Sequence, residues 1–408
     1  MRVVIAPDKF KGSLSAPEVA QHLAAGLRVS AASLGYPIDV LSIPVADGGE
    51  GTVDAAVGAG FESCTATVTG PTGRLVQATF AVRGSEAVIE MAAASGLGVL
   101  PDGIPAPLGA TSRGTGDLIR AALDAGCRHI VLAVGGSAST DGGSGVLRGL
   151  GARFLDSRFL HADGAEIPDG GGFLTGLDRI DLSGLDDRLK ETIIVLASDV
   201  DNPLLGAHGA ATVFGPQKGA SPAEILCLEA GLTHFVSVLG ETIGARAEDA
   251  ANEAGAGAAG GVGYAALAVL GAVRRAGIDV VLEFTELDKR LAGADLVITG
   301  EGCLDHQSLA GKTPVGVARA ATRAGIPVIA ICGRTTLEPS EARLAGFQHI
   351  YPLTELEPDP AISMADAGPL LEQLGQQIGR HYAPDGPPAQ NLVTVPASGR
   401  PPLAVRRT

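Results

Sequence analysis

The sequence predicts an α/β protein built around a doubly wound parallel sheet. Short β-branched runs of strand length alternate with Ala-rich segments of helical composition, and this alternation is typical of parallel sheets covered by helices on both faces. The aromatic content is 3%, with no Trp, so the core must consist of Ala, Val, Leu and Ile, which suits buried parallel strands. Glycine, at 58 of 408 residues, is about twice as frequent as usual. It clusters after the apolar runs, where strands turn into helices.

The individual elements follow from the hydrophobic pattern. Apolar runs bounded by turn residues are predicted to be buried strands: Arg2–Ala6, Asp39–Pro44, His129–Val134, Thr192–Ala197, Asp295–Thr299, Pro327–Cys332 and His349–Leu353. Ala-rich segments that precede most of these strands are predicted to be helices: Ala16–Val29, Thr115–Ala125, Thr313–Ala324 and Ser340–Ala345. Helical crossovers of this kind place binding loops at the carboxyl ends of the strands.

One stretch of the chain departs from this order. The runs Cys64–Val68, Leu75–Val82 and Ala87–Met91 are short and alternating, and the turn sequences GPTG and RGSE separate them. This pattern indicates an antiparallel meander. A change from antiparallel to α/β order suggests a second, mixed α/β domain inserted into the first.

The expected domain boundaries are therefore discontinuous. Residues 1–62 plus 290–382 would form one domain and residues 63–289 the inserted one. The segment 113–150 is itself α/β-like and fits either domain. Residues 383–408 are rich in Pro and polar side chains without a sustained period, so we expect a disordered tail there.

Composition excludes several classes of function. Thirty basic against forty-five acidic side chains give a net charge of −15, which repels a nucleic-acid backbone and argues against a nucleic-acid partner. The five cysteines form no CxxC pair, as in proteins of a reducing compartment without structural zinc. The chain starts directly in a strand-like run, and we expect neither a signal segment nor a membrane span. A cytoplasmic protein without a membrane partner is expected, and a homodimer is compatible with the sequence.

The first candidate site is the loop in APDKFKGSLSA. Ser15 and Glu18 have the spacing of a helix capping box, and that part of the loop is structural. Asp8, Lys9 and Lys11 fall between a predicted strand end and a helix N-terminus, where phosphate charge is usually neutralised. Solvated surface lysines are the simpler reading of this loop when it is taken alone.

Further Gly-rich loops follow other predicted strands. PVADGGEGT carries Asp47, a carboxylate suited to holding magnesium or orienting a hydroxyl, although a plain turn would look similar. TSRGTGDL carries Arg113, whose guanidinium can bind a carboxylate or phosphate. AVGGSASTDGGSG, with Gly135 and Gly136 near its start, offers backbone N–H groups and hydroxyls at a helix start, a general anion cradle. The same DGG sequence occurs in both PVADGGEGT and this loop.

The later loops add carboxylates and one more cation. Asp199 follows a strand in IVLASDVDNPLLG, and TGEGCLDHQSLAGKTPVG contains Glu301 and Lys312. His306 is most simply a partner of neighbouring carboxylates. Cys303 has no activating base nearby in sequence, so a free thiol is the expected reading. The single GxGxxG spacing, GAGAAG, does not follow a strand, so it is weak support for dinucleotide binding.

Together these loops indicate an enzyme that handles a nucleotide or a phosphate. In a doubly wound sheet, loops after successive strands converge at one crevice. Phosphoryl transfer requires carboxylates that bind magnesium and cations that neutralise phosphate charge. It also requires Gly-rich loops that let the backbone come close to the phosphates. A magnesium-dependent hydrolase such as a phosphatase, or a non-enzymatic sensor of nucleotides or sugar acids, would use similar groups.

Seven ordered motifs carry a resemblance to a known family. APDKFKGSLSA, ADGGEGT, GGSASTDGGSG, DVDNPLLG, VFGPQKGA, GAAGGVGYA and TGEGCLDHQSLAGKTPVGVA resemble the bacterial glycerate kinases of type I, over about residues 1–380. The resemblance implies phosphorylation of D-glycerate by ATP with Mg²⁺, usually to 2-phosphoglycerate. It also implies a Rossmann-like domain joined to a second α/β domain, with the site between them.

Residue roles are hypotheses built on these loops. We expect Arg113, with Ser137 and Ser139, to hold the glycerate carboxylate, and Asp8 to contact the substrate. Lys11 would bind the transferring phosphate. Asp199 and Asp47 would serve magnesium or accept the hydroxyl proton, and the sequence does not separate these two roles. The remaining residues expected to bind nucleotide or phosphate groups are Lys9, Gly135, Gly136, Lys312 and Glu301.

Overall fold

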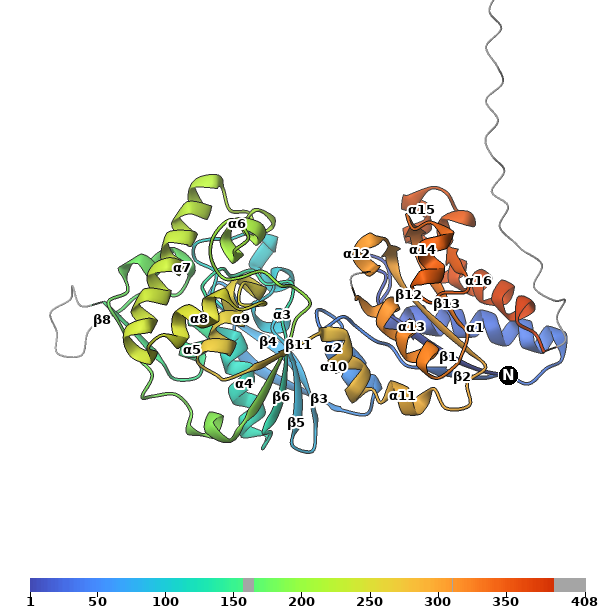
Figure 1. Cartoon of the computed structure of the whole chain (residues 1–408), viewed down its shortest axis with the longest axis horizontal. Helices are drawn as coiled ribbons and strands as arrows, with labels where there is room; N and C mark the ends of the chain where they lie inside the picture. Colours follow the sequence, from blue (N-terminus) through green and yellow to red (C-terminus); the bar gives the residue numbers. More distant parts are fainter. Residues whose placement is uncertain (157–164, 310, 385–408) are drawn as a thin grey trace, which may run out of the picture.

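The structure is a computed structural model that describes residues 1–156, 165–309 and 311–384. Its described strands form two large sheets and one small one. Figure 1 shows the large sheets side by side, with helices α2 (Thr52–Gly58) and α10 (Gly277–Phe284) lying between them. The predicted class, an α/β protein with one parallel sheet and a second mixed unit, is confirmed.

The first sheet is parallel throughout. Its described strands run in the order β14-β13-β12-β1-β2. If these five strands are numbered 1 to 5 along the chain and read from the β2 edge, the order is 2-1-3-4-5. This is a doubly wound order, in which the direction of strand succession reverses between β1 and β12. Ligands of such sheets bind outside the carboxyl ends of the strands at this reversal. The strands are β1 (Arg2–Pro7), β2 (Asp39–Ser42), β12 (Leu296–Leu304), β13 (Val328–Thr335) and β14 (Ile350–Pro352).

Successive side chains along β1 point to opposite faces of this sheet. Val3 and Ile5 join a core with helices α1 (Ala16–Leu34) and α16 (Ala367–His381). Val4 and Ala6 face the opposite core, which contains α13 (Thr313–Arg323) and α2. Because both faces are buried, the strand reads as a continuous apolar run. Four shorter helices complete this part of the chain: α11 (Leu287–Arg290), α12 (His306–Leu309), α14 (Pro339–Leu344) and α15 (Pro360–Ala365).

The second sheet is mixed, in the order β11-β10-β6-β5-β4-β3 for the described strands. Its first four members are parallel, and β3–β4–β5 form the predicted antiparallel meander. Strand β6 belongs to this sheet, so the strand of the segment 113–150 pairs here. The strands are β3 (Glu62–Thr69), β4 (Leu75–Arg83), β5 (Glu86–Glu90), β6 (His129–Ala133), β10 (Ile193–Ala197) and β11 (Val273–Arg275).

Helices cover the outer face of the second sheet, and helices α2 and α10 contribute to the core on its other face. The covering helices are α3 (Ala92–Ser95), α4 (Arg113–Asp124), α5 (Ser144–Gly149), α6 (Ala210–Phe214), α7 (Pro222–Ile243), α8 (Arg246–Asn252) and α9 (Val262–Ala268). The small sheet consists of β7 (Arg153–Asp156), β8 (Ala165–Glu166) and β9 (Arg179–Asp181). The predicted tail lies outside the described residues from position 385 on.

Helix α7 differs from the sequence expectation. Among the described helices it is the one long and apolar enough, by length and composition, to cross a membrane. Its buried side chains include Leu228, Leu232, Phe235 and Leu239, which fall three or four residues apart and form one apolar stripe. All four belong to the core of the second sheet. One face of the helix therefore packs against this core, and a third of its most apolar window is buried.

Candidate active site

A cleft of about 730 Å³ opens at the carboxyl ends of β1 and β12, where the strand order of the first sheet reverses. Loops from both sheets line it: residues 8–13 and 47–50 follow strands of the first sheet, and Gly135 and Gly136 follow β6 of the second. Residues 301–305, Lys312, the end of β13 and the segment 353–367 complete the lining. The cleft therefore lies where a doubly wound sheet is expected to bind its ligand.

Asp8 is the first residue after β1, and the surrounding loop holds its side chain firmly. Its carboxylate accepts hydrogen bonds from the Lys9 backbone N–H at 2.7 Å and from the Thr313 hydroxyl at 2.7 Å. Burial, reinforced by the negative charge of Asp47, raises the pKa of Asp8 to about 7. Asp8 is thus a buried carboxyl group in the cleft whose protonation changes near neutral pH.

Four cations reach the cleft, and three have no ion pair within the described part of the chain. Lys9 donates to the Glu50 carbonyl at 2.7 Å and lies 3.0 Å from the Glu50 carboxylate. Lys11, Lys312 and Arg334 line the cleft without such a partner among the described residues. Lys11, Lys312 and Arg334 therefore carry charges that no salt bridge among the described residues engages, on a cleft that five acidic side chains also line, and these charges can bind an anionic ligand.

Arg334 was missed by sequence reasoning because its strand is longer than predicted. The pattern placed the strand end at Cys332, whereas β13 continues to Thr335. Arg334 lies opposite Cys303 of β12 in the parallel ladder. An arginine after a glycine at a strand end was the available signal.

Asp47 and Asp199 come together from the two large sheets. Asp199 accepts a hydrogen bond from the Gly277 backbone N–H at 2.8 Å. A Cβ on Gly277 would lie 2.0 Å from the Asp47 carbonyl oxygen, so only glycine permits this approach. Burial raises the pKa of Asp199 to about 6, and the charge of Asp47 adds to the rise. Asp47 lines the cleft, whereas Asp199 is not among its lining residues.

The carboxylates near the cleft can be compared with the needs of magnesium. Among the described residues no group of three or more His, Cys, Asp or Glu side chains could hold a metal ion by itself. Mg²⁺ in kinases is commonly held by only one or two carboxylates together with substrate phosphates. Glu301 fits that arrangement, because its Oε1 atom is buried in the cleft wall without a hydrogen-bond partner among the described residues. Burial also raises the pKa of Glu301.

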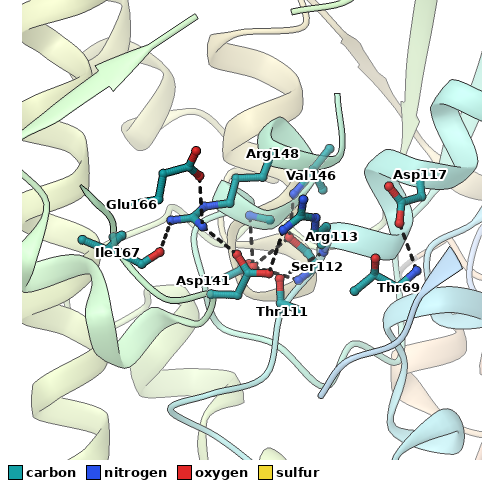
Figure 2. Close-up of polar contacts among 12 residues, drawn as sticks. Thr69, Thr111, Ser112, Arg113, Asp117, Asp141, Val146, Arg148, Glu166 and Ile167 are labelled. Carbon is teal, nitrogen blue, oxygen red and sulfur yellow. Dashed lines mark hydrogen bonds and ion pairs between the residues drawn. The ribbon is translucent and has the colours of Figure 1, made fainter. Parts of the chain in front are cut away.

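The second DGG sequence has a structural role (Figure 2). Asp141 is completely buried and accepts hydrogen bonds from the Ser112 N–H and hydroxyl, both at 2.8 Å, and from the Gly143 and Gly145 N–H groups. Burial raises the pKa of Asp141, while these hydrogen bonds lower it. Asp141 therefore ties the loop before α4 to the start of α5.

Ser137 and Ser139 lie buried behind the cleft wall formed by Gly135 and Gly136. The Ser139 hydroxyl has no hydrogen-bond partner among the described residues. Ser137 accepts a hydrogen bond from the Lys218 ammonium group at 2.7 Å. The serines are thus close to the cleft in sequence, but neither lines it in this structure.

Lys218 is a site-adjacent cation that sequence reasoning left out. Its Nζ atom donates to the Ser137 hydroxyl and the Ser139 carbonyl and lies 3.4 Å from the Thr140 hydroxyl. Burial lowers the pKa of Lys218 to about 7, against the opposing effect of Asp141. Lys218 therefore stabilises the Gly-rich loop from the side away from the cleft. The sequence places this lysine in a turn and does not indicate that it is buried.

Arg113 lies outside the cleft lining. Its guanidinium is 3.6 Å from the Asp169 carboxylate, and its side chain is 44% exposed. Asp169 makes a shorter ion pair, 3.0 Å, with the buried Arg148, which also contacts Glu166 and Ile167 (Figure 2). Because Asp169 already has a closer partner, the Arg113 guanidinium is only loosely held.

Two minor interpretations concern the loop after β12. His306 lies 3.0 Å from the Glu341 carboxylate, so it pairs with a carboxylate, but with one from α14 and not with one of its sequence neighbours. The Cys303 thiol is free and lies 3.8 Å from Asp305.

Comparison with known proteins gives one consistent result. A sequence model of the glycerate kinase family matches residues 3–383. The chain is 48% identical to glycerate 2-kinase of Escherichia coli K12, over 86% of this chain and 90% of that protein. It is 45% identical to glycerate kinase of Bacillus subtilis 168, with the same coverage of both chains. The crystal structure of a Salmonella typhimurium LT2 protein assigned as glycerate kinase 2 superposes with a TM-score of 0.77 at 43% identity, covering 93% of this chain and 97% of that one.

Proposed function

From the premise that this chain belongs to the glycerate kinase family, we propose that it transfers the γ-phosphoryl group of Mg-ATP to D-glycerate and releases 2-phosphoglycerate. The observation that carries the ATP part of the proposal is the set of three cations, Lys11, Lys312 and Arg334, that have no ion pair among the described residues and line a cleft with Asp8 and Asp47. Cations for phosphate charge beside carboxylates are what phosphoryl transfer requires.

The donor would occupy the cleft with its phosphates toward Lys11 and Lys312. Lys11 would neutralise charge on the transferring phosphoryl, and the Gly135–Gly136 backbone would approach it closely because no side chain intervenes. Lys9 would act more weakly, since Glu50 already pairs with it. Bound Mg²⁺ would neutralise charge on the phosphate oxygens, and Asp47 and Glu301 are the carboxylates on this cleft that would hold it.

The acceptor would lie between the cleft and the loops of the second sheet. Arg113 is available for the glycerate carboxylate because its contact with Asp169, at 3.6 Å, is longer than a hydrogen bond. Ser137 and Ser139 would add hydroxyl contacts, and the unpartnered Ser139 hydroxyl supports this role. Asp8, which lines the cleft, would contact a glycerate hydroxyl.

Asp199 is the better candidate of the two carboxylates for accepting the hydroxyl proton. Its pKa is raised by burial to about 6, closer to the operating pH that suits a general base. Asp47 lines the phosphate cleft, whereas Asp199 lies beyond it. In this assignment the glycerate hydroxyl oxygen attacks the γ-phosphorus, its proton passes to Asp199, and ADP leaves.

The wider expectations are part of the same proposal. The proposal includes two domains, one of residues 1–62 plus 290–382 and one of residues 63–289. The assignment of the strands to sheets supports this division, since each domain contains one large sheet. The net charge of −15 argues against a nucleic-acid partner, and the proposal includes an enzyme that works on small molecules in the cytoplasm without a membrane partner. A homodimer remains compatible with these features.

The test is an assay of ADP release with Mg-ATP and D-glycerate, with the product then offered to enolase in the absence of phosphoglycerate mutase. Glycerate-dependent ADP followed by phosphoenolpyruvate is the expected result. ADP without phosphoenolpyruvate would reject the 2-phosphate as product. ADP formation that does not depend on glycerate would indicate a hydrolase instead.

A further inference from the structure

The cleft has an apolar wall that phosphate chemistry does not use. Five lining residues are apolar: Phe10, Leu353, Pro360, Met364 and Ala367. The last four come from one segment that runs from the end of β14 through α15 to the start of α16. Figure 1 shows α15 above the end of the first sheet at which β12 and β13 finish. This segment carries no Gly-rich motif, and none of its residues was predicted to belong to the site.

Two contacts fix this wall against the lysine-bearing loop. The Ser13 hydroxyl donates to the Met364 carbonyl at 2.6 Å. A Cβ on Gly12 would lie 3.3 Å from the Met364 methyl carbon, Cε. The Met364 side chain is therefore adjacent to the loop that carries Lys11, yet 50% of the residue is exposed. An exposed methionine on the rim of a charged cleft is suited to cover a flat apolar ligand.

Polar residues lie on the same wall. Thr354 and Ser363 line the cleft, and each carries a hydroxyl that can donate and accept hydrogen bonds. Ser363 is otherwise buried. Small-molecule pockets combine mostly apolar walls with a few such polar groups that fix orientation. An aromatic heterocycle with hydrogen-bonding edges matches both features.

We infer that this wall is the nucleobase subsite of the donor, with Met364 packing on the face of a purine ring whose phosphates extend toward Lys11. The inference rests on the proposed function, because that function requires a nucleotide as phosphate donor. It further assigns the residues of the cleft that would distinguish a nucleotide from a polyphosphate without a base. The wall and the unpaired cations belong to one continuous cleft. A ligand with an apolar ring at one end and several negative charges at the other would therefore contact both.

The test compares Met364→Ala with Ile362→Ala by calorimetric titration. Ile362 is a matched control, because it is on the same helix and 47% exposed but does not line the cleft. Each protein is titrated with ADP and separately with inorganic tripolyphosphate, which lacks the base. Since Met364 is half exposed, covering it fully would contribute about half the burial energy of a methionine, which corresponds to roughly a fivefold change in affinity.

The expected result is that Met364→Ala weakens ADP binding about fivefold and leaves tripolyphosphate binding unchanged, while Ile362→Ala alters neither. Equal losses for ADP and tripolyphosphate would mean that Met364 only supports the loop, and the inference would be overturned. Unchanged ADP affinity in Met364→Ala would overturn it as well. Wild-type protein that phosphorylates glycerate but fails these comparisons would leave the proposed function intact, whereas a failure to bind ADP at all would overturn both.

Discussion

Replacing Asp8 with asparagine should stabilise the protein at alkaline pH while impairing its activity. Burial and the charge of Asp47 raise the pKa of Asp8 from 3.8 to about 7 in the folded protein. Between these values the folded protein binds more protons than the unfolded chain, so its stability falls as the pH rises through this window. Above pH 7 the folded protein carries the full cost of an ionised Asp8.

The magnitude follows from the shift in pKa. Three pKa units correspond to about 4 kcal/mol, which is an upper bound because the cleft is open to water and to nearby lysines. The asparagine side chain would keep an acceptor for the Lys9 N–H, and the Thr313 hydroxyl can rotate to accept from its amide. We therefore expect Asp8→Asn to raise the free energy of unfolding by about 2–4 kcal/mol at pH 8 and to change it little at pH 4.

The assay is a series of urea and thermal unfolding curves between pH 4 and 8.5, without nucleotide or Mg²⁺. The decisive quantity is the difference between variant and wild type as a function of pH, which should rise through pH 4–7 and then level off. Asp102→Asn is the control, because Asp102 is exposed on a turn and the same chemical change should give a difference that is flat with pH. A flat difference for Asp8→Asn, or a variant less stable than wild type at pH 8, would refute the reasoning. Unimpaired turnover in the variant would remove Asp8 from the substrate site.

Five further substitutions test the proposed roles. Lys11→Ala should lower turnover by orders of magnitude in an ADP-release assay with an unchanged melting temperature, and near-normal turnover would reject its role. Arg113→Ala should mainly raise the KM for glycerate, and a change in the KM for ATP alone would reassign it to the donor. Asp199→Asn should depress kcat while Asp47→Asn raises the Mg²⁺ concentration needed for half-maximal rate, and the opposite pattern would exchange the two roles. Lys218→Met leaves buried acceptors without a donor and should lower unfolding free energy by about 1–3 kcal/mol, measured with urea, and no loss would mean that the loop does not need its brace.

The sequence predicted most strand positions because both faces of the first sheet are buried. Predicted and observed ends agree closely for β1 and β6. Strands β12 and β13 are longer than predicted, since β12 continues past Thr299 to Leu304 and β13 continues past Cys332 to Thr335. The residues beyond Thr299 include glycines that usually weaken a strand. Gly300 is required there, because a Cβ would lie 2.0 Å from the Ile331 carbonyl oxygen of the neighbouring strand. A tertiary contact of this kind is not encoded in local propensity.

The candidate site was predictable only where its residues sit in Gly-rich loops. Such loops mark strand ends, so Asp8, Lys11 and Asp47 could be proposed from the sequence and all three line one cleft. Lys218 was not assigned a role because a lysine in a turn is normally solvated, and its burial arises from packing by distant segments. Met364 was missed for the opposite reason, since an apolar residue on a short helix looks like ordinary core until its exposure beside the cleft is seen.

The two DGG sequences show how burial separates a structural carboxylate from a functional one. In both, the aspartate accepts the backbone N–H of the second glycine, Gly49 or Gly143, and the intervening glycine has a positive φ. This local turn is the same and is encoded locally. Asp141, however, is fully buried and accepts three further hydrogen bonds, which occupy its oxygens. Asp47 accepts only the turn hydrogen bond among the described residues and borders the cleft. Its remaining lone pairs are free for a ligand, so of the two aspartates only Asp47 has the free acceptor capacity that chemistry on a phosphate would need.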